Sequence, residues 1–388
     1  MADKVDALPS LGTPPGVQVN RGYTRYTVFQ HRFDVPSAYK VYRVLHATPS
    51  VAVCAAVDSS ESPQRRVVIK KYASVFSCID RARALIKGVH AMRSSAHANV
   101  IEILRIIHPG EPKEVFSDVY VVVPLMDTNL ERLLRGRQCL SLEQCQYVLV
   151  SIARGLLYIH SLGLPHGGIS PWNVLLGAGE VKLCDVGAPT GSVLLGDSPM
   201  GTGFVKRRWY QPPEISTAGT PHPPAGDMWA LGIIACELLT GGKVQMRGRD
   251  YIHQILLAVE LIGVPQESSC EFMSPEGKRV ALSANGPATL SESLCSLPSD
   301  AQHLVRHLLQ FHPAERFTAR DVLSHPFLAR FKSPEDEAVS EEKLTFMTVE
   351  GANEDQLRRV LWEMLSTPPA ADEDDASLRN VYMALDST

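Results

Sequence analysis

The first part of the chain alternates apolar and polar residues with a period of two, which is typical of β-strands. The strongly apolar run at residues 118–126 predicts a buried strand, and helical spacing of apolar residues predicts a helix at 80–93. The other strands are expected at the β-rich runs 23–30, 37–45, 51–58 and 65–72.

After about residue 130 the apolar pattern changes to the period of a helix. Residues 142–163 carry an apolar stripe that ends at a glycine, and residues 225–242 are apolar on all sides, which is typical of a buried central helix. Further helices are predicted at residues 251–263, 300–311 and 318–331. We therefore expect an α+β protein with a small β-rich lobe followed by a larger helical lobe.

This pattern divides the chain into four parts. Residues 1–21 contain proline and glycine and are expected to form a flexible lead, followed by a β-rich lobe at 22–127 and a helical lobe at 128–331. Residues 332–388 begin acidic and contain one amphipathic helix at 353–366. We expect this extension to wrap the helical lobe and then to fray at its tail.

Composition narrows the class of protein. A formal net charge of -4 gives no support to nucleic acid or an anionic membrane as the main partner, and no run of 18 apolar residues suggests a membrane span. The eight cysteines are scattered singly, without a C-x-x-C pair, which argues against a zinc site or a disulfide framework. Reduced thiols predict a cytoplasmic or nuclear protein, and the sequence does not choose between the two.

Six motifs in a fixed order, spread over about 260 residues, resemble the landmarks of a eukaryotic protein kinase. Residues 207–215, RRWYQPPEI, are similar to the T-R-W-Y-R-A-P-E segment of MAP kinases, and 251–268 and 334–374 resemble the helical insert and C-terminal extension of that family. The resemblance covers residues 22–375 and implies a bilobal kinase fold. The six motifs are VVIKKY, LPHGGISPWNVLL, KLCDVG, RRWYQPPEI, DMWALGIIACELLTG and PAERFTARDVLSHPF.

The resemblance also implies a nucleotide site, of which only part is retained. Lys70 stands where the family's lysine pairs with the phosphates of ATP, although a surface lysine on an edge strand would look the same. The three positions of the family's glycine-rich loop hold His46, Thr48 and Val51, with Pro49 between them. Glycine lets backbone amides approach phosphates closely, so we do not expect tight nucleotide binding here. Further apolar residues are expected at the wall and hinge of the cleft, namely Val123 and Met126.

Three residues that catalyse phosphoryl transfer in the family are replaced. Gly88 stands where a glutamate holds the lysine in place, Gly168 where an aspartate accepts the substrate's proton, and Ser170 where a lysine steadies the transferred phosphate. Each tenfold loss of rate corresponds to about 1.4 kcal/mol of transition-state stabilisation, and two such groups are missing from one loop. We do not expect efficient transfer of phosphate to a protein.

The metal positions of the family survive. Asn173 and Asp185 resemble the pair that holds magnesium, so a metal–nucleotide site stays open, and the alternative is that Asp185 caps a turn with backbone hydrogen bonds. In the activation lip Thr202 is retained, but Phe204 replaces the tyrosine and cannot be phosphorylated. His166 is expected to be a packed core residue.

Other positions that the resemblance picks out concern the scaffold and docking. Glu214 and Arg316 resemble the family's buried ion pair, and Asp227 resembles the aspartate that binds the catalytic-loop backbone. Glu335 and Asp336 stand where MAP kinases carry an acidic patch for basic docking peptides, or they form an ordinary solvated acidic face.

Three functions remain open at this point. Loss of catalytic positions with retention of the scaffold favours a pseudokinase that acts as a scaffold, docking partner or allosteric regulator in phosphorylation signalling. Its expected partners are proteins with basic docking peptides, including kinases or phosphatases, and a monomer is expected. A slow, atypical serine/threonine kinase that uses ATP and magnesium is the alternative, and a metabolite sensor in the old nucleotide cleft is the third.

Overall fold

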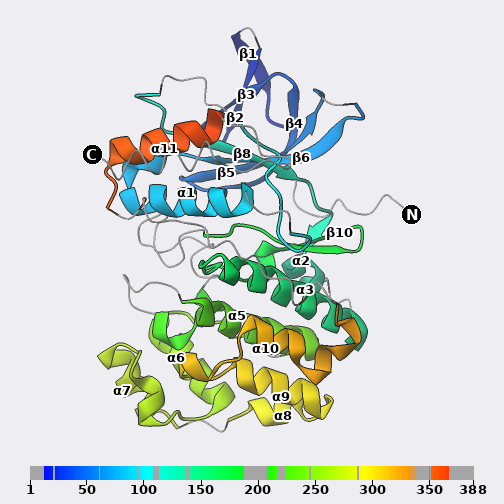
Figure 1. The fold of residues 1–388 in the computed structure, drawn as a ribbon, viewed down its shortest axis with the longest axis vertical. Helices are drawn as coiled ribbons and strands as arrows, with labels where there is room; N and C mark the ends of the chain where they lie inside the picture. The colour runs from blue at the N-terminus through cyan, green and yellow to red at the C-terminus, as the bar shows by residue number, and fades with distance from the viewer. Residues whose placement is uncertain are drawn as a thin grey trace.

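The computed structural model describes thirteen parts of the chain: residues 13–20, 22–60, 62–93, 97–107, 113–136, 140–187, 208–215, 223–243, 246–285, 288–333, 336, 349 and 351–366. Figure 1 shows a β-rich lobe at one end of the molecule and a helical lobe at the other. The predicted α+β fold with a β-rich and a helical lobe is therefore confirmed.

The β-rich lobe is built on an antiparallel sheet with strand order β4-β5-β6-β8-β7. The apolar runs of the sequence pair along it, so that Cys54 of one strand faces Ile69 of the next, and Ile69 faces Val122. Helix α1 (Ile79–Arg93) lies against this sheet (Figure 1), after the 3₁₀ helix η1 (Val75–Ser77). The strands are β4 (Tyr39–Ala47), β5 (Val51–Asp58), β6 (Arg65–Tyr72), β7 (Arg105–Ile107) and β8 (Val119–Pro124).

A second, three-stranded sheet precedes this one, formed by β1 (Gly16–Asn20), β2 (Tyr23–Val28) and β3 (His31–Pro36). Its apolar face packs into one core with the main sheet, where the Phe33 ring meets the Tyr120 ring edge-to-face at 5.3 Å. The flexible lead expected at 1–21 is therefore wrong for residues 16–20, which form a strand. Residues 1–12 lie outside the described parts of the chain.

The helical lobe surrounds α5 (Pro224–Leu239), which is buried over most of its length, as the all-round apolar pattern predicted. Helix α3 (Leu142–Ser161) packs on it and begins at a capping box between Ser141 and Gln144. The remaining helices are α2 (Leu130–Arg135), α6 (Tyr251–Ile262), α7 (Pro275–Ser283), α8 (Leu290–Leu294), α9 (Ser299–Leu308), α10 (Ala319–Ser324) and α11 (Glu354–Ser366).

Short elements complete the lobe. A small sheet of β9 (Thr128–Asn129), β10 (Val174–Gly177) and β11 (Glu180–Leu183) lies where the two lobes meet. Short 3₁₀ helices connect the longer elements: η2 (Pro171–Asn173), η4 (Pro213–Ile215), η5 (Glu267–Cys270), η6 (Pro313–Glu315) and η7 (Pro326–Phe331).

Helix α11 returns to the β-rich lobe and lies beside α1 (Figure 1). The Arg93 guanidinium donates to the Met364 carbonyl oxygen at 2.5 Å, and the Trp362 ring meets the Phe116 ring at 5.4 Å. The C-terminal extension was expected to wrap the helical lobe, and this is wrong for its helix. An amphipathic pattern shows that a helix buries one face but not which lobe receives it.

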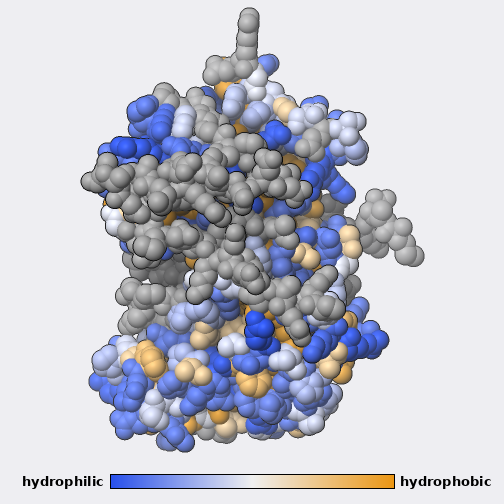
Figure 2. All heavy atoms as spheres, in the orientation of Figure 1, coloured by the Kyte–Doolittle hydropathy of each residue, from blue (hydrophilic) through white to orange (hydrophobic). Residues whose placement is uncertain are grey.

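None of the described helices is long and apolar enough to cross a membrane. Figure 2 shows a mostly hydrophilic surface on the visible face of the described residues, with hydrophobic residues scattered among them. Singly scattered apolar residues are ordinary on a folded protein and mark no interface by themselves.

A relay of histidines joins α9 to η7. The His325 Nδ1 atom accepts the Phe327 amide at 3.2 Å, so its Nε2–H donates to His303 Nδ1 at 2.9 Å. The His307 ring lies 4.0 Å from the His303 ring, and its Nδ1–H donates to the His303 carbonyl oxygen. This arrangement requires His325 and His303 to be neutral.

We expect protonation of this relay to lower the free energy of unfolding in mild acid. Burial, and then the neighbouring His303, lower the pKa of His325 below 6.5, while the Asp300 carboxylate opposes the shift. The unfolded chain then binds the proton more readily than the folded chain. The contribution of His325 to the free energy of unfolding is therefore fully present above pH 6.5 and decreases as the pH drops below that value. Urea midpoints across this range would show the decline, and His325→Asn, which keeps a capping acceptor without the charge, should flatten it. Equal slopes for both proteins would contradict this origin.

Candidate active-site cleft

Two charged residues predicted from the sequence meet between the lobes. The Lys70 ammonium, from β6, lies 2.5 Å from the Asp185 carboxylate, which follows β11. The Lys70 ammonium also lies 5.1 Å from the centre of the Tyr72 ring. Burial alone would lower the pKa of Lys70, but the Asp185 charge and the Tyr72 hydroxyl outweigh it and raise the pKa above its ordinary value. Lys70 is therefore a cation whose charge is neutralised inside the protein.

Gly88 of α1 packs directly on the backbone that follows Asp185. A Cβ placed on Gly88 would lie 2.2 Å from the Val186 carbonyl oxygen, a distance that side chains essentially never adopt. Gly187, with a φ of 67°, closes the contact from the other side, because its own Cβ would lie 3.0 Å from the Gly88 Cα. Position 88 therefore has no room for any side chain while α1 lies here.

The loop between β4 and β5 is a closed hairpin turn. The Thr48 amide donates to the Val51 carbonyl oxygen at 2.8 Å, and the Val51 amide donates to the Thr48 hydroxyl at 3.2 Å. Pro49 has no amide hydrogen, and the His31 ring holds the Thr48 carbonyl oxygen at 2.5 Å. His46, the remaining loop position, pairs with Val53 within the sheet. Two of the loop's amides are thus engaged within the turn itself.

The loop after α3 is held by Asp227 of the buried helix α5. Its carboxylate accepts the His166 amide at 2.8 Å and the Gly167 amide at 2.9 Å, as expected for this residue from the resemblance. Asn173 donates its side-chain amide to the Gly168 carbonyl oxygen at 2.8 Å, so the loop closes on itself. Gly168 contributes only backbone here.

His166 and Ser170 both point into the protein. His166 is fully buried, and burial lowers the pKa of its imidazole. Ser170 is also buried and accepts the Asn173 amide on its carbonyl oxygen. The loop therefore contains neither a carboxylate nor a cation among residues 166–173.

The helical lobe contains a buried ion pair beneath η4. Arg316 makes two hydrogen bonds to the Glu214 carboxylate, at 2.6 and 2.8 Å, and its side chain has no exposed surface. The remaining guanidinium hydrogens reach the carbonyl oxygens of Gln310, Phe311 and Ala225. This geometry satisfies both charges, which is what a buried pair requires.

The two apolar residues predicted for the cleft are partly buried. Val123 of β8 pairs with Val68 of β6, and Met126 follows β8. Both pack against the main hydrophobic core.

Comparison with known proteins decides the family. The model of the protein kinase domain matches residues 51–328. The chain belongs to the protein kinase family. It is 32% identical over 363 residues to mitogen-activated protein kinase 5 of Oryza sativa subsp. japonica, which covers 92% of this chain and 97% of that protein. It is 33% identical over 372 residues to mitogen-activated protein kinase 5 of Arabidopsis thaliana, covering 93% of this chain and 97% of that protein.

A third relative, mitogen-activated protein kinase 6 of Arabidopsis thaliana, is 33% identical over 336 residues, or 85% of this chain and 83% of that protein. The kinase-family protein described here is therefore of the MAP-kinase-like, serine/threonine type. The C-terminal extension lies beyond residues 51–328, which the kinase-domain model matches.

Kinases use ATP and magnesium, and the cleft of this protein fits that pair poorly. The loop amides that would cradle phosphates are closed in a turn, and the Asp185 carboxylate that would hold magnesium is paired with Lys70. Among the described residues no group of three or more acidic, histidine or cysteine side chains is arranged to hold a metal ion.

The docking position departs from its expected role. The Asp336 carboxylate is buried and lies 2.5 Å from the Arg154 guanidinium of α3, while its second oxygen accepts the Ser333 amide. A carboxylate that is buried and already paired is not accessible to a basic peptide. Asp336 instead ties the segment after η7 to helix α3. Its neighbour Glu335 and the activation-lip residues Thr202 and Phe204 lie outside the described parts of the chain.

Sequence reasoning missed two contacts in this kinase-like cleft. Tyr72 was not identified as a neighbour of Lys70, although it lies two residues further along the same strand and so on the same face. The contact between Gly88 and Gly187 was also missed. The available signal was the pair of glycines at positions 88 and 187, because glycine lets two backbone segments approach each other closely.

Proposed function

We propose that this protein is a MAP-kinase-like pseudokinase that works through protein contacts, as a scaffold, docking partner or allosteric regulator in phosphorylation signalling. The observation that carries the proposal is the packing of Gly88 on Val186 and Gly187. The glutamate that clamps the lysine in active kinases is absent here, and the space for it is filled by backbone. Gly168, where the catalytic base would stand, adds a second loss that is independent of the first.

The physical reason is that phosphoryl transfer depends on positioning and charge neutralisation. Lys70 neutralises Asp185 here instead of phosphates, and the loop at 166–173 contains no carboxylate that could accept the proton of a substrate hydroxyl. We propose that its partners are signalling kinases or phosphatases; the buried, paired Asp336 gives no support to binding of basic docking peptides through that residue. A monomer in the cytoplasm or nucleus fits this role.

A nucleotide titration tests the proposal. We expect no rise in Tm when ATP and magnesium are added, because the cleft is closed to nucleotide. A nucleotide that did bind would, at 100 times its Kd, stabilise the fold by about 2.7 kcal/mol and so raise the Tm. Lys70→Ala should respond like the wild type, and so should the control Lys40→Ala on the exposed side of β4. A nucleotide-dependent rise that Lys70→Ala removes and Lys40→Ala keeps would contradict a cleft that is closed to nucleotide.

The second candidate is a slow, atypical serine/threonine kinase. One observation favours it: Lys70, Asp185 and Asn173, the three retained residues, surround the same end of the cleft. Phosphate incorporation into a generic protein substrate that Asp185→Ala abolishes would establish this function and exclude the pseudokinase. Incorporation that persists in Asp185→Ala would indicate a contaminating kinase.

A further inference from the structure

Three arginines lie together on the surface of the helical lobe, beside the segment that leads into η4. Arg247 and Arg249 are exposed, and Arg208 is partly buried. The Arg208 guanidinium donates to the Arg249 carbonyl oxygen at 2.7 Å, which joins the segment at 208–212 to the segment at 246–250. We call these three residues the arginine cluster.

Trp209 holds the arginine cluster in place. Its indole N–H donates to the Gly248 carbonyl oxygen at 3.3 Å, and the Arg247 guanidinium lies 5.3 Å from the centre of its ring. A guanidinium over an aromatic face is attracted to it by the charge distribution of the ring. This contact orients Arg247 before any ligand arrives, which reduces the entropy that binding costs.

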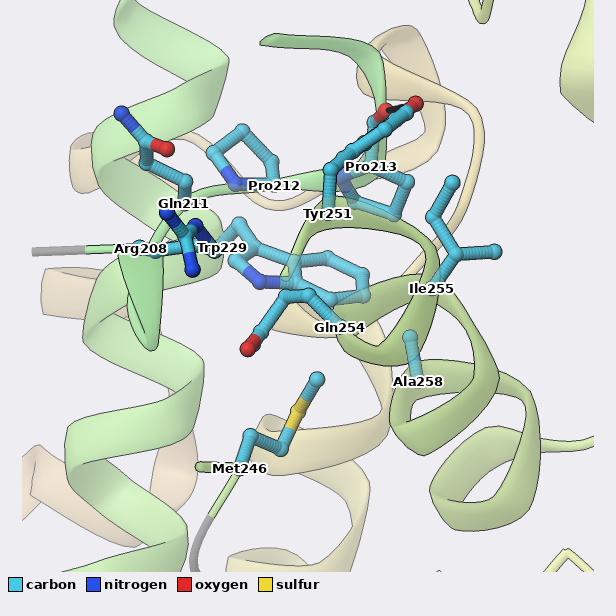
Figure 3. Close-up of a pocket in the computed structure, with 10 residues that line it drawn as sticks. All are labelled: Arg208, Gln211, Pro212, Pro213, Trp229, Met246, Tyr251, Gln254, Ile255 and Ala258. Atoms are coloured by element: carbon cyan, nitrogen blue, oxygen red, sulfur yellow. Dashed lines mark hydrogen bonds between the residues drawn. The ribbon is translucent and has the colours of Figure 1, made fainter. Parts of the chain in front are cut away.

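Figure 3 shows where the two segments meet. Arg208 and Met246 lie on the walls of one small pocket, together with Gln254 of α6. The Gln254 side chain accepts the Gly248 amide at 2.9 Å, and a Cβ on Gly248 would collide with it. Met246 and Gly248 are therefore packed against the lobe, while the arginine that follows each of them is exposed.

The surface around the arginine cluster is positive although the whole protein is acidic. The segments at 208–212 and 246–250 contain three arginines and one acid, so their formal charge is +2, against -4 for the protein. The acid, Asp250, is the N-cap of α6 and accepts the His253 amide at 2.8 Å. Neither Arg247 nor Arg249 forms an ion pair with another residue that the structure describes.

Two further carboxyl groups lie near the cluster, inside the lobe. Glu237 of α5 is buried and accepts the Tyr210 hydroxyl at 2.7 Å, and burial raises its pKa to about 7. This carboxyl is therefore about half protonated at neutral pH and offsets only part of the Arg247 charge. Glu131 of α2 is paired with Arg135. The outward side of the cluster keeps its positive charge.

An aromatic surface continues from the cluster toward the loop at 166–173. The Trp172 ring of η2 lies 6.3 Å from the Trp209 ring and 6.0 Å from the Tyr210 ring, and both tryptophans are half-buried. Tryptophan and arginine are among the residues that contribute most to the binding energy of protein interfaces. Positive charge and aromatic area therefore occur side by side on this face.

We propose that the arginine cluster and the two tryptophans bind a phosphorylated segment of another protein. A phosphate monoester carries a charge of about -1.5 to -2 at pH 7 and three acceptor oxygens, which suit the planar N–H forks of arginine. An apolar side chain beside the phosphorylated residue packs on the tryptophans. The phosphate is bound and no bond forms or breaks, so the inference does not depend on whether this protein transfers phosphate.

The chemistry of the surface favours phosphate over other anions. A carboxylate has two oxygens and suits one guanidinium fork, whereas a phosphate can contact two arginines at once. A nucleic acid gains its affinity from many phosphate contacts along a long positive surface, and this protein is acidic outside the cluster.

The test measures the fluorescence anisotropy of a labelled peptide with the full-length protein and no nucleotide. The peptide carries one phosphoserine between two leucines, and its unphosphorylated form is the control. We expect a Kd of about 100 µM for the phosphopeptide and binding of the control at least about tenfold weaker. Added salt should weaken binding of the phosphopeptide, because the cluster is exposed.

Arginine variants locate the site. Arg247→Ala and Arg249→Ala should each weaken phosphopeptide binding about tenfold, through loss of charge-assisted hydrogen bonds. Arg249→Lys should recover only part of the affinity, because lysine keeps the charge without the fork. The matched control is Arg320→Ala on α10, an exposed arginine outside the cluster that should bind like the wild type. Both cluster positions are exposed, so these variants should keep the Tm of the wild type.

The proposal is overturned if neither peptide binds at up to about 1 mM, or if the two peptides bind equally. Wild-type affinity in both Arg247→Ala and Arg249→Ala would also overturn it. Inorganic phosphate that displaces the peptide at the peptide's own Kd would exclude a peptide site, and so would tighter binding of a short single-stranded RNA. None of these measurements uses ATP, so their failure is distinct from a failure of the pseudokinase proposal.

Discussion

Replacing Gly88 by alanine should destabilise the protein by about 2 kcal/mol, although alanine is normally the better helix former by about 1 kcal/mol. The reason is steric: the new Cβ would lie 2.2 Å from the Val186 carbonyl oxygen, so α1 or the segment at 186–187 must shift. Both are backbone and cannot yield by rotating a side chain. Chemical denaturation of the two proteins would measure the difference.

Gly136→Ala is the matched control. Gly136 caps the C-terminus of α2 with a φ of -67°, and a Cβ there would lie 3.3 Å from its nearest neighbour, the Arg132 carbonyl oxygen. We expect its free energy of unfolding to change by less than about 1 kcal/mol. A stabilising Gly88→Ala would mean that α1 does not rest on this backbone, and the closed cleft of the proposed pseudokinase would lose its main support.

The same contact predicts the result of restoring the catalytic residues. Gly88→Glu combined with Gly168→Asp should not create an efficient kinase, because a glutamate at position 88 cannot reach Lys70 without moving α1 away from Val186. Helix α1 is also held from its far side by α11, through Arg93 and Met364.

Replacing Arg316 by methionine should destabilise the protein by about 4 kcal/mol, since it leaves the Glu214 carboxylate buried without its partner. The carbonyl oxygens of Gln310, Phe311 and Ala225 would also lose a donor. Denaturant titration would again measure the loss. Adding Glu214→Gln to Arg316→Met should recover part of it, because the uncompensated charge is then removed.

The surface pair of Arg330 and Glu143 provides the control. Its guanidinium lies 2.8 Å from the carboxylate, similar to the buried pair, but the two side chains are 66% and 53% exposed. Arg330→Met should therefore cost less than about 1 kcal/mol. Equal losses for the two arginine variants would show that burial does not set the energy of the Glu214 pair.

Much of the fold could be predicted from patterns within single elements. The β-rich runs at 51–58 and 65–72 form β5 and β6 with the same bounds, and the all-round apolar run near 225–242 contains the buried helix α5. Each is predicted well because burial of its own side chains decides its structure. Strand β1 was missed because a five-residue edge strand among prolines and glycines carries little pattern.

The candidate site could likewise be predicted only in part. The sequence itself shows that positions 88 and 168 are glycine and that Lys70 and Asp185 are retained. Three contacts of the site could not be predicted from the sequence, because they depend on residues distant in the chain or on loop geometry. They are the pair of Lys70 and Asp185, the turn closed by Thr48 and Val51, and the burial of Asp336 against Arg154.

The sequence by itself determined which chemical groups this protein has and lacks: a kinase-like scaffold with no carboxylate at positions 88 and 168. Only the tertiary structure decided that the space beside position 88 is filled by the backbone of residues 186–187, and that α11 packs on α1. The physical reason is that composition and periodicity report the burial of each element, whereas close contacts depend on how separately formed elements approach one another.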